Sequence, residues 1–412
     1  MREPIMNQAE HIIPTRARPF EKTGKKTPFW LKRLLGRELA PSRDEYRAVT
    51  DALWDGDQPM DDLVTWMFEE NPKQRRAQIQ KAFEGDLTDA PQAVLDFFDT
   101  LSTPPAWIDF DLIEEGVDFI HSVGISAGYV LRDLALMGGY MLSGFNQSLV
   151  MTGALNKGTA QRIAETGKWW IDCTEHNGMR PFGPGYKSTL HVRMVHSLVR
   201  RGLDKHPDWD HARWGRPLSQ IDMVATYLGF SVVMILGLRK MGIPVLPRES
   251  RAVIHLWSYA CWIMGVEEKW LVQSEAEGMV LLNHTYATQS LPDATSKELA
   301  KSLSEEPLER SYHRFQNLKR KLSYHQHLGM SQYFLGKDKM AKLGFEDLGL
   351  PWYPLVSNAP RALLYTAEHF LPGQRKRQQK LGRQAQMDML ASMFGEKEHA
   401  IINPDTDHPA HV

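Results

Sequence analysis

Apolar residues recur at intervals of three and four along most of this chain, and this helical spacing limits the possible folds more than any other feature of the sequence. Between residues 44 and 370, few runs alternate apolar and polar residues as strands do, and turn signals rich in Pro and Gly separate the helical segments. We therefore predict an all-α protein, a multi-helix bundle. The predicted helices span residues 60–83, 91–101, 111–124, 126–152, 158–176, 188–202, 219–241, 249–264, 268–281, 308–328 and 360–370.

The same pattern divides the chain into three parts. Residues 1–43 form an N-terminal arm that we expect to be partly ordered, residues 44–370 a single helical domain, and residues 371–412 a charged helix with a loose tail. In the arm, residues 27–39 mix aromatic and basic side chains, which suits either a helix docked on the domain or peripheral contact with an acidic membrane. In the tail, Glu396 and His399 have the ExxH spacing of di-metal sites, but without a second such pair we assign them no metal.

Charge and cysteine content exclude several classes of protein. The 412 residues include 49 Lys and Arg against 50 Asp and Glu, so the chain lacks the overall positive charge of a nucleic-acid-binding protein. Two cysteines, Cys173 and Cys261, are too few for a disulfide framework. The first 40 residues show no secretory signal, and the longest uncharged stretch, residues 223–238, is shorter than the roughly 20 residues of a membrane span. We expect a cytoplasmic protein with a buried helix at 223–238.

The most informative segment is the predicted helix over residues 188–202, for which Ser188 is a plausible N-cap and Gly202 a C-terminal glycine. At about 100° per residue, Val192 and Val199 lie within about 60° of His196 on one side, and Arg193 and Arg200 within about 60° on the other. The back of the helix is also apolar, so the helix should be central in the fold.

Two arginines on a central helix need negative partners, because an unpaired buried charge costs several kcal/mol. Carboxylates from neighbouring helices would serve. A haem would serve as well: His196 would ligate its iron, Val192 and Val199 would contact the ring, and Arg193 and Arg200 would neutralise its propionates. The spacing alone leaves both possibilities open.

An earlier predicted helix contains a second polar pair. Arg162 and Thr166 are four residues apart and therefore share a face. Taken alone, the pair is a weak signal and is more typical of a surface arginine and a threonine bonded to its own helix than of a functional site.

Together, Arg162-xxx-Thr166 and Arg193-Met-Val-His196-Ser-Leu-Val-Arg200 resemble the signature of the rubber oxygenase (latex clearing protein) catalytic-domain family, which includes a fungal endoplasmic-reticulum oxygenase of mycophenolic-acid synthesis. The likeness continues through residues 217–222, 226–231 and 237–242 to residues 262–266. It implies a globin-like helical core that binds haem b, with His196 as the proximal iron ligand and O2 as co-substrate. It also implies that Arg162 and Thr166 lie close to the haem pocket and that Arg193 and Arg200 flank it.

The sequence departs from that family at one chemically important position. Where the latex-clearing branch has an acidic residue, this chain has Asn146, and an amide cannot take up a proton near neutral pH. We therefore expect a haem-dependent oxygenase that acts on a hydrophobic small molecule or isoprenoid-like substrate, with Arg162, Thr166 and Asn146 near the reacting groups. The alternative is a haem-binding sensor or carrier without turnover, and a third possibility is a helical protein without haem.

Overall fold

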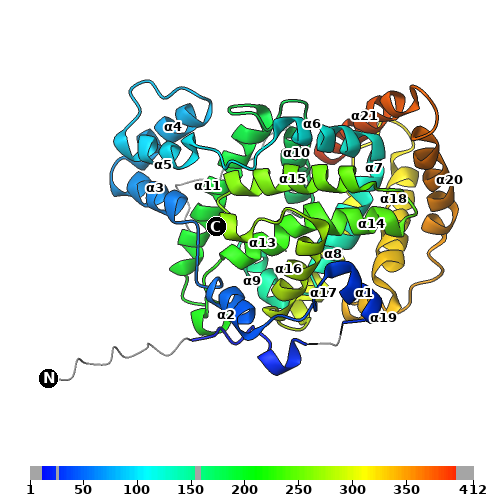
Figure 1. The fold of residues 1–412 in the computed structure, drawn as a ribbon, viewed down its shortest axis with the longest axis horizontal. Coiled ribbons are helices and arrows are strands. Elements are labelled where there is room, and N and C mark those ends of the chain that lie inside the picture. Colours follow the sequence, from blue (N-terminus) through cyan, green and yellow to red (C-terminus); the bar gives the residue numbers. More distant parts are fainter. Residues whose placement is uncertain (1–11, 25–26, 154–158, 396–412) are drawn as a thin grey trace.

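The structure is a computed structural model, and it describes residues 12–24, 27–153 and 159–395. Within these residues all regular secondary structure is helical, and no strand is present (Figure 1). The all-α prediction is confirmed. Glu396 and His399 lie outside the described residues.

The helices follow one another with short connections along the chain. The first half contains α1 (Phe29–Leu35), α2 (Arg43–Asp51), α3 (Gln58–Glu69), α4 (Pro72–Phe83), α5 (Gln92–Ser102), α6 (Phe110–Val123), α7 (Ile125–Tyr129), the π-helix η2 (Val130–Leu136), α8 (Met137–Gly139), α9 (Ser143–Met151), α10 (Thr159–Cys173) and α11 (Pro184–Asp204). The second half contains α12 (His211–Trp214), α13 (Gln220–Leu228), the π-helix η3 (Gly229–Val233), α14 (Met234–Lys240), α15 (Pro247–Ile263), α16 (Glu275–Ala287), α17 (Ala294–Glu305), α18 (Gln316–Leu335), α19 (Lys337–Lys342), α20 (Trp352–Glu368) and α21 (Gln374–Phe394).

The core is built where α6 packs against both α15 and α21, and where α11 packs against α10, α3 and α15. Gly116 on α6 permits the closest approach of α15: a Cβ at this position would lie 2.7 Å from the Ala252 carbonyl oxygen. In α15 nearly every residue from Ala252 to Cys261 is buried, so this helix is enclosed on all sides. Figure 1 shows α15 crossing the middle of the molecule, with α3, α4 and α5 at one end and α18 and α20 at the other.

Several predicted helix boundaries were wrong, each for a local reason. The segment 60–83 is two helices, because Pro72 starts α4 after Asn71 adopts a left-handed conformation. Pro360, which we took as a helix start, lies inside α20. The prediction missed α2 and α17, although both begin with a capping box, at Ser42 and at Asp293.

The domain is larger than residues 44–370. Gln386 on α21 is fully buried and donates to the carbonyl oxygens of Ile120 and Gly124, at 2.9 and 3.2 Å. At the other end, Arg16 is buried and pairs with Asp222 on α13. The charged C-terminal helix and the described part of the N-terminal arm are therefore integral parts of one domain.

The continuous helical segment Gln220–Lys240 is long and apolar enough to span a membrane by length and composition. Two thirds of its most apolar window, 67%, is buried inside the protein. The structure thus uses this segment as a core helix, in agreement with the prediction for residues 223–238.

Candidate site on helix α11

Helix α11 is longer than predicted and begins and ends at other residues. It starts at Pro184, whose missing N–H costs nothing at the first helical position, and Gly183 is the N-cap. Ser188 is inside the helix and donates its hydroxyl to the Pro184 carbonyl at 2.9 Å. Gly202 is also internal, because the helix continues to Asp204. Both predicted caps were therefore wrong, but the face on which His196 lies is unchanged.

His196 is a neutral imidazole in this environment. Burial is the main cause that lowers its pKa to about 4, and the positive charges of Arg200 and Arg162 lower the pKa further. Its Nδ1 atom is enclosed and finds no hydrogen-bond partner among the described residues. Neutral imidazole is the form that binds metal ions.

The face of α11 around His196 keeps accessible surface although the helix is central. Val192, Val195, His196 and Val199 are only half-buried, and their spacing of three and four residues places them on one stripe. The imidazole of His196 therefore keeps some accessible surface although burial lowers its pKa. Apolar side chains flank the ring along this stripe, as the sequence predicted for Val192 and Val199.

Arg193 is neutralised by a carboxylate of the protein itself. Its Nε and Nη2 atoms donate to the two oxygens of Asp57 at 2.6 and 2.7 Å, and its Nη1 donates to the Ile263 carbonyl at 2.9 Å. The side chains of both charged partners are almost fully buried. Because Asp57 already neutralises the charge of Arg193 in this bidentate pair, the guanidinium group is not available to pair with another anion.

Arg200 is also neutralised by a carboxylate of the protein, Asp61 on α3, which follows Asp57 by four residues. Its Nη1 donates to Asp61 at 2.5 Å, and its remaining nitrogens donate to the carbonyl oxygens of Pro217 and Leu218 at 3.2 and 2.9 Å. The hydroxyl of Ser197 donates to the same Asp61 oxygen at 2.6 Å.

The structure therefore corrects the assignment of Arg193 and Arg200 to haem propionates. Of the two possibilities left open by the sequence, carboxylates from a neighbouring helix supply the negative charge. Sequence analysis did not single out Asp57 and Asp61. The available signal was two acidic residues four apart at the start of a helix with an apolar face, a pattern too common to identify a partner 136 residues away.

Arg162 is the arginine near His196 that keeps its charge free. It lies on α10, which packs against α11, and it forms no ion pair or hydrogen bond with the described residues. Burial lowers its pKa, and yet the residue retains accessible surface, as Thr166 one turn later does. Arg162 therefore has an accessible positive charge that no ion pair among the described residues neutralises, although the more distant Glu165 carboxylate also acts on it.

Asn146 lies in a different environment from the one predicted. Its side-chain amide donates to the Tyr140 carbonyl at 2.9 Å and to the hydroxyls of Ser296 and Thr295 at 3.2 and 3.3 Å. The residue is completely buried, and its Oδ1 has no partner among the described residues. These contacts fix α9 against the start of α17, and they give no support to the predicted catalytic role of Asn146.

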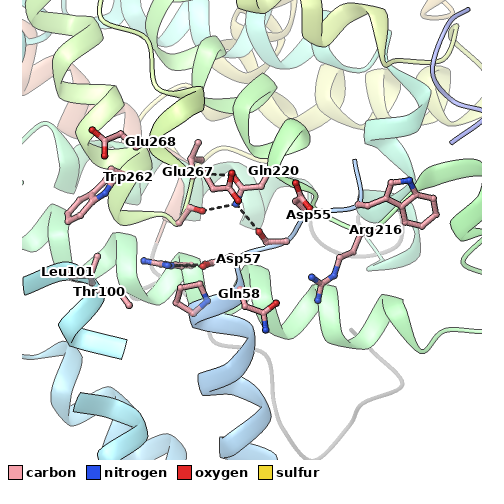
Figure 2. Close-up of a pocket in the computed structure, with 16 residues that line it drawn as sticks. Asp55, Asp57, Gln58, Thr100, Leu101, Arg216, Gln220, Trp262, Glu267 and Glu268 are labelled. Carbon is pink, nitrogen blue, oxygen red and sulfur yellow. Dashed lines mark hydrogen bonds and ion pairs between the residues drawn. The ribbon is translucent and has the colours of Figure 1, made fainter. Parts of the chain in front are cut away.

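A pocket of about 430 Å³ lies beside the Arg193–Asp57 pair rather than beside His196. Figure 2 shows Gln220 at its centre, where the side-chain amide donates to the carbonyl oxygens of Gly56 and Gly265. Carboxylates of Asp55, Glu267 and Glu268 and the indole of Trp262 line the pocket. It is thus a polar pocket, lined by several carboxylates.

The residues around His196 fit a haem at two points. The neutral imidazole would be able to ligate the iron, and the guanidinium of Arg162 would suit a propionate. The fit does not extend to Arg193 and Arg200, because both are already paired.

Comparison with known proteins agrees with this architecture. Residues 122–367 match the family described as ER-bound oxygenase mpaB/B′ and rubber oxygenase, catalytic domain. Among solved structures, latex clearing protein in its closed state superposes with a TM-score of 0.62 at 19% sequence identity, covering 86% of this chain and 95% of that one. No curated protein sequence matches the chain significantly. The family match covers more than half of the chain, and the chain therefore belongs to the mpaB and rubber oxygenase catalytic-domain family, a family of oxygenases.

Proposed function

We propose that this protein is a haem b-dependent oxygenase that uses O2 on a hydrophobic small-molecule or isoprenoid-like substrate. The observation that carries the proposal is His196: a neutral, partly accessible imidazole on a central helix, without a hydrogen-bond partner in the described part of the chain. A buried ring nitrogen such as this Nδ1 is costly for a fold when it has no hydrogen-bond partner, and an iron ligand role of the imidazole would explain why the histidine is retained.

Each of the residues around His196 would have a separate role in binding the haem. His196 would hold the iron, the stripe of Val192, Val195 and Val199 would contact the apolar ring, and Arg162 would neutralise a propionate. Thr166 would shape the same space one helical turn away. When bound, the haem would supply the chemistry of dioxygen, and the protein would supply access and orientation.

The visible spectrum tests the ligand assignment. We expect the wild-type protein to bind haemin with a strong Soret band, and the His196→Ala variant to lose or markedly shift that band because the proposed iron ligand is removed. His191→Ala is the matched control: His191 lies on the same helix, contacts the Phe83 ring edge to face and faces Glu84 at 3.7 Å. An unchanged Soret band in His196→Ala would overturn the assignment.

The alternative of a haem sensor or carrier follows from Asn146, whose amide is engaged in structural hydrogen bonds. Consumption of O2 with formation of an oxygenated product from an apolar substrate would exclude that alternative. Stable binding of haem and O2 without a product from any apolar substrate would favour it. The cytoplasmic location stays a prediction from the sequence.

A further inference from the structure

One end of the molecule exposes much more apolar surface than the rest. Of the 23 large apolar side chains that the described residues expose, 13 lie between residues 315 and 387, on α18, α20, α21 and their connections. Figure 1 places these three helices together at its right-hand side. The exposed residues are Phe315, Leu318, Leu322, Leu350, Trp352, Leu355, Val356, Leu363, Leu364, Phe370, Leu371, Leu381 and Met387. We call this surface the α18–α20–α21 face.

Helix α20 shows this exposure of apolar side chains most clearly. Trp352, Val356 and Leu363 follow one another at helical spacing, and Phe370 extends the line beyond the helix, with Leu363 72% and Phe370 78% exposed. A surface helix normally turns a charged stripe toward water. The two charged residues of α20 do not supply one: Glu368 is buried, and Arg361 donates to the Tyr353 hydroxyl at 2.7 Å.

The three helices are joined to one another by direct contacts. Gln332 on α18 donates to the Gly349 carbonyl just before α20 begins, at 3.0 Å. The backbone N–H of Ser311, ahead of α18, donates to the Ser392 carbonyl near the end of α21, at 2.8 Å. Since α20 also contacts α21, each helix is tied to the other two.

Basic side chains cluster at one part of this surface, at the start of α21, whereas the exposed acidic residues Glu346, Asp347 and Asp388 lie at its borders. Lys376, Arg377 and Lys380 on α21 are exposed and form no ion pair among the described residues. Between residues 350 and 387 the single acidic residue is the buried Glu368, and residues 310–337 contain none. Exposed apolar patches beyond a few hundred Å² mark interaction surfaces, and here the partner must also accept positive charge.

We propose that the α18–α20–α21 face docks on an anionic membrane surface. Leucines would enter the acyl boundary, Trp352 and Phe370 would lie at the interface, and the three free basic side chains would contact lipid phosphates. A second copy of this chain fits less well, because a two-fold interface would bring the same positive charges together. The proposal does not depend on haem binding, and it would place the oxygenase where apolar substrates dissolve.

Flotation with lipid vesicles tests the proposal. The full-length protein should float with vesicles of phosphatidylcholine mixed with phosphatidylglycerol, and added salt should release it. The triple variant Lys376→Glu, Arg377→Glu and Lys380→Glu should bind these vesicles at least tenfold more weakly, as should the double variant Leu363→Asp and Phe370→Asp. All five side chains are exposed, so far-UV circular dichroism and thermal unfolding should match the wild type.

Matched controls lie elsewhere on the surface. The exposed basic residues in Arg47→Glu, Lys205→Glu and Arg251→Glu carry the same change of charge, and Leu291→Asp changes an apolar side chain that is 71% exposed. Both controls should bind vesicles like the wild type. Wild-type protein that stays unbound with every vesicle composition would overturn the proposal, and so would a dimer in light scattering that the Leu363→Asp and Phe370→Asp variant disperses.

Discussion

Three arginines near His196 differ in their partners, and the partners decide what each can do. Arg193 and Arg200 pair with Asp57 and Asp61, whereas Arg162 forms no ion pair among the described residues. Helical spacing placed Arg193 and Arg200 beside His196 correctly. Spacing carries no information about which carboxylates reach them, and this is why the propionate assignment was wrong.

The different partners predict opposite results for two substitutions. Asp57→Asn should lower the free energy of unfolding by about 3–5 kcal/mol, because it leaves the buried charge of Arg193 uncompensated, while haemin stoichiometry stays unchanged. Arg162→Met should leave the fold as stable as the wild type, or more so, and weaken haemin binding at least tenfold. Denaturant unfolding and haemin titration measure the two properties. Loss of haemin binding in a folded Asp57→Asn protein would instead indicate that Arg193 takes part in binding the cofactor.

At the scale of elements, close helix crossings hold the core around α11. Gly116 lets α6 approach the Ala252 carbonyl of α15, and Gly185 lets α11 approach Cys173 on α10, where an added Cβ would lie 2.6 Å from the cysteine Cα. The two π-helical segments also meet, with Ala135 of η2 next to Gly229 of η3. Small residues at these crossings allow backbones to pack closely, and α10 and α11 are thereby positioned together.

A pair of glycine substitutions tests this account. Gly116→Ala should lower the free energy of unfolding by about 1–3 kcal/mol, because the new methyl group overlaps a backbone carbonyl that cannot move away freely. Gly139→Ala is the control: nothing lies within 4 Å of its added Cβ, and alanine is the better helix former by up to about 1 kcal/mol. Equal stability of the two variants in chemical denaturation would contradict the close-crossing account.

At the scale of the whole molecule, balanced total charge conceals a segregation of charged and ionisable groups. Three exposed basic residues that form no ion pair among the described residues, Lys376, Arg377 and Lys380, lie on the α18–α20–α21 face, and the interior holds histidines that burial keeps neutral. The histidines whose pKa is lowered are His121, His191, His196, His255, His284 and His327. Each takes up a proton more readily when the chain is unfolded. Protonation of these histidines should therefore lower the free energy of unfolding as the pH falls.

His121 provides a test of that expectation. Burial, followed by the positive charge of Arg383, lowers its pKa to about 4, and its Nε2 lies 2.6 Å from the Thr174 carbonyl oxygen. The unfolded chain binds this proton below about pH 6.5 and the folded chain below about pH 4. As pH falls across that window, the wild type should lose up to about 3 kcal/mol relative to His121→Gln, in unfolding measured at several pH values. A constant difference between the two proteins would show that His121 does not titrate in this way.

The sequence by itself determined the helical class, the face of α11 on which His196 lies between Val192 and Val199, and the motif that identifies the family. These features are local, because helical periodicity and short spacings depend only on residues that lie within about twenty positions of one another in the sequence. Tertiary structure alone decided that Arg193 and Arg200 pair with acidic residues 136 and 139 positions away, that Arg162 stays free, and that α20 turns an apolar stripe outward. Such outcomes depend on which helices meet, and that is a property of packing rather than of any single segment.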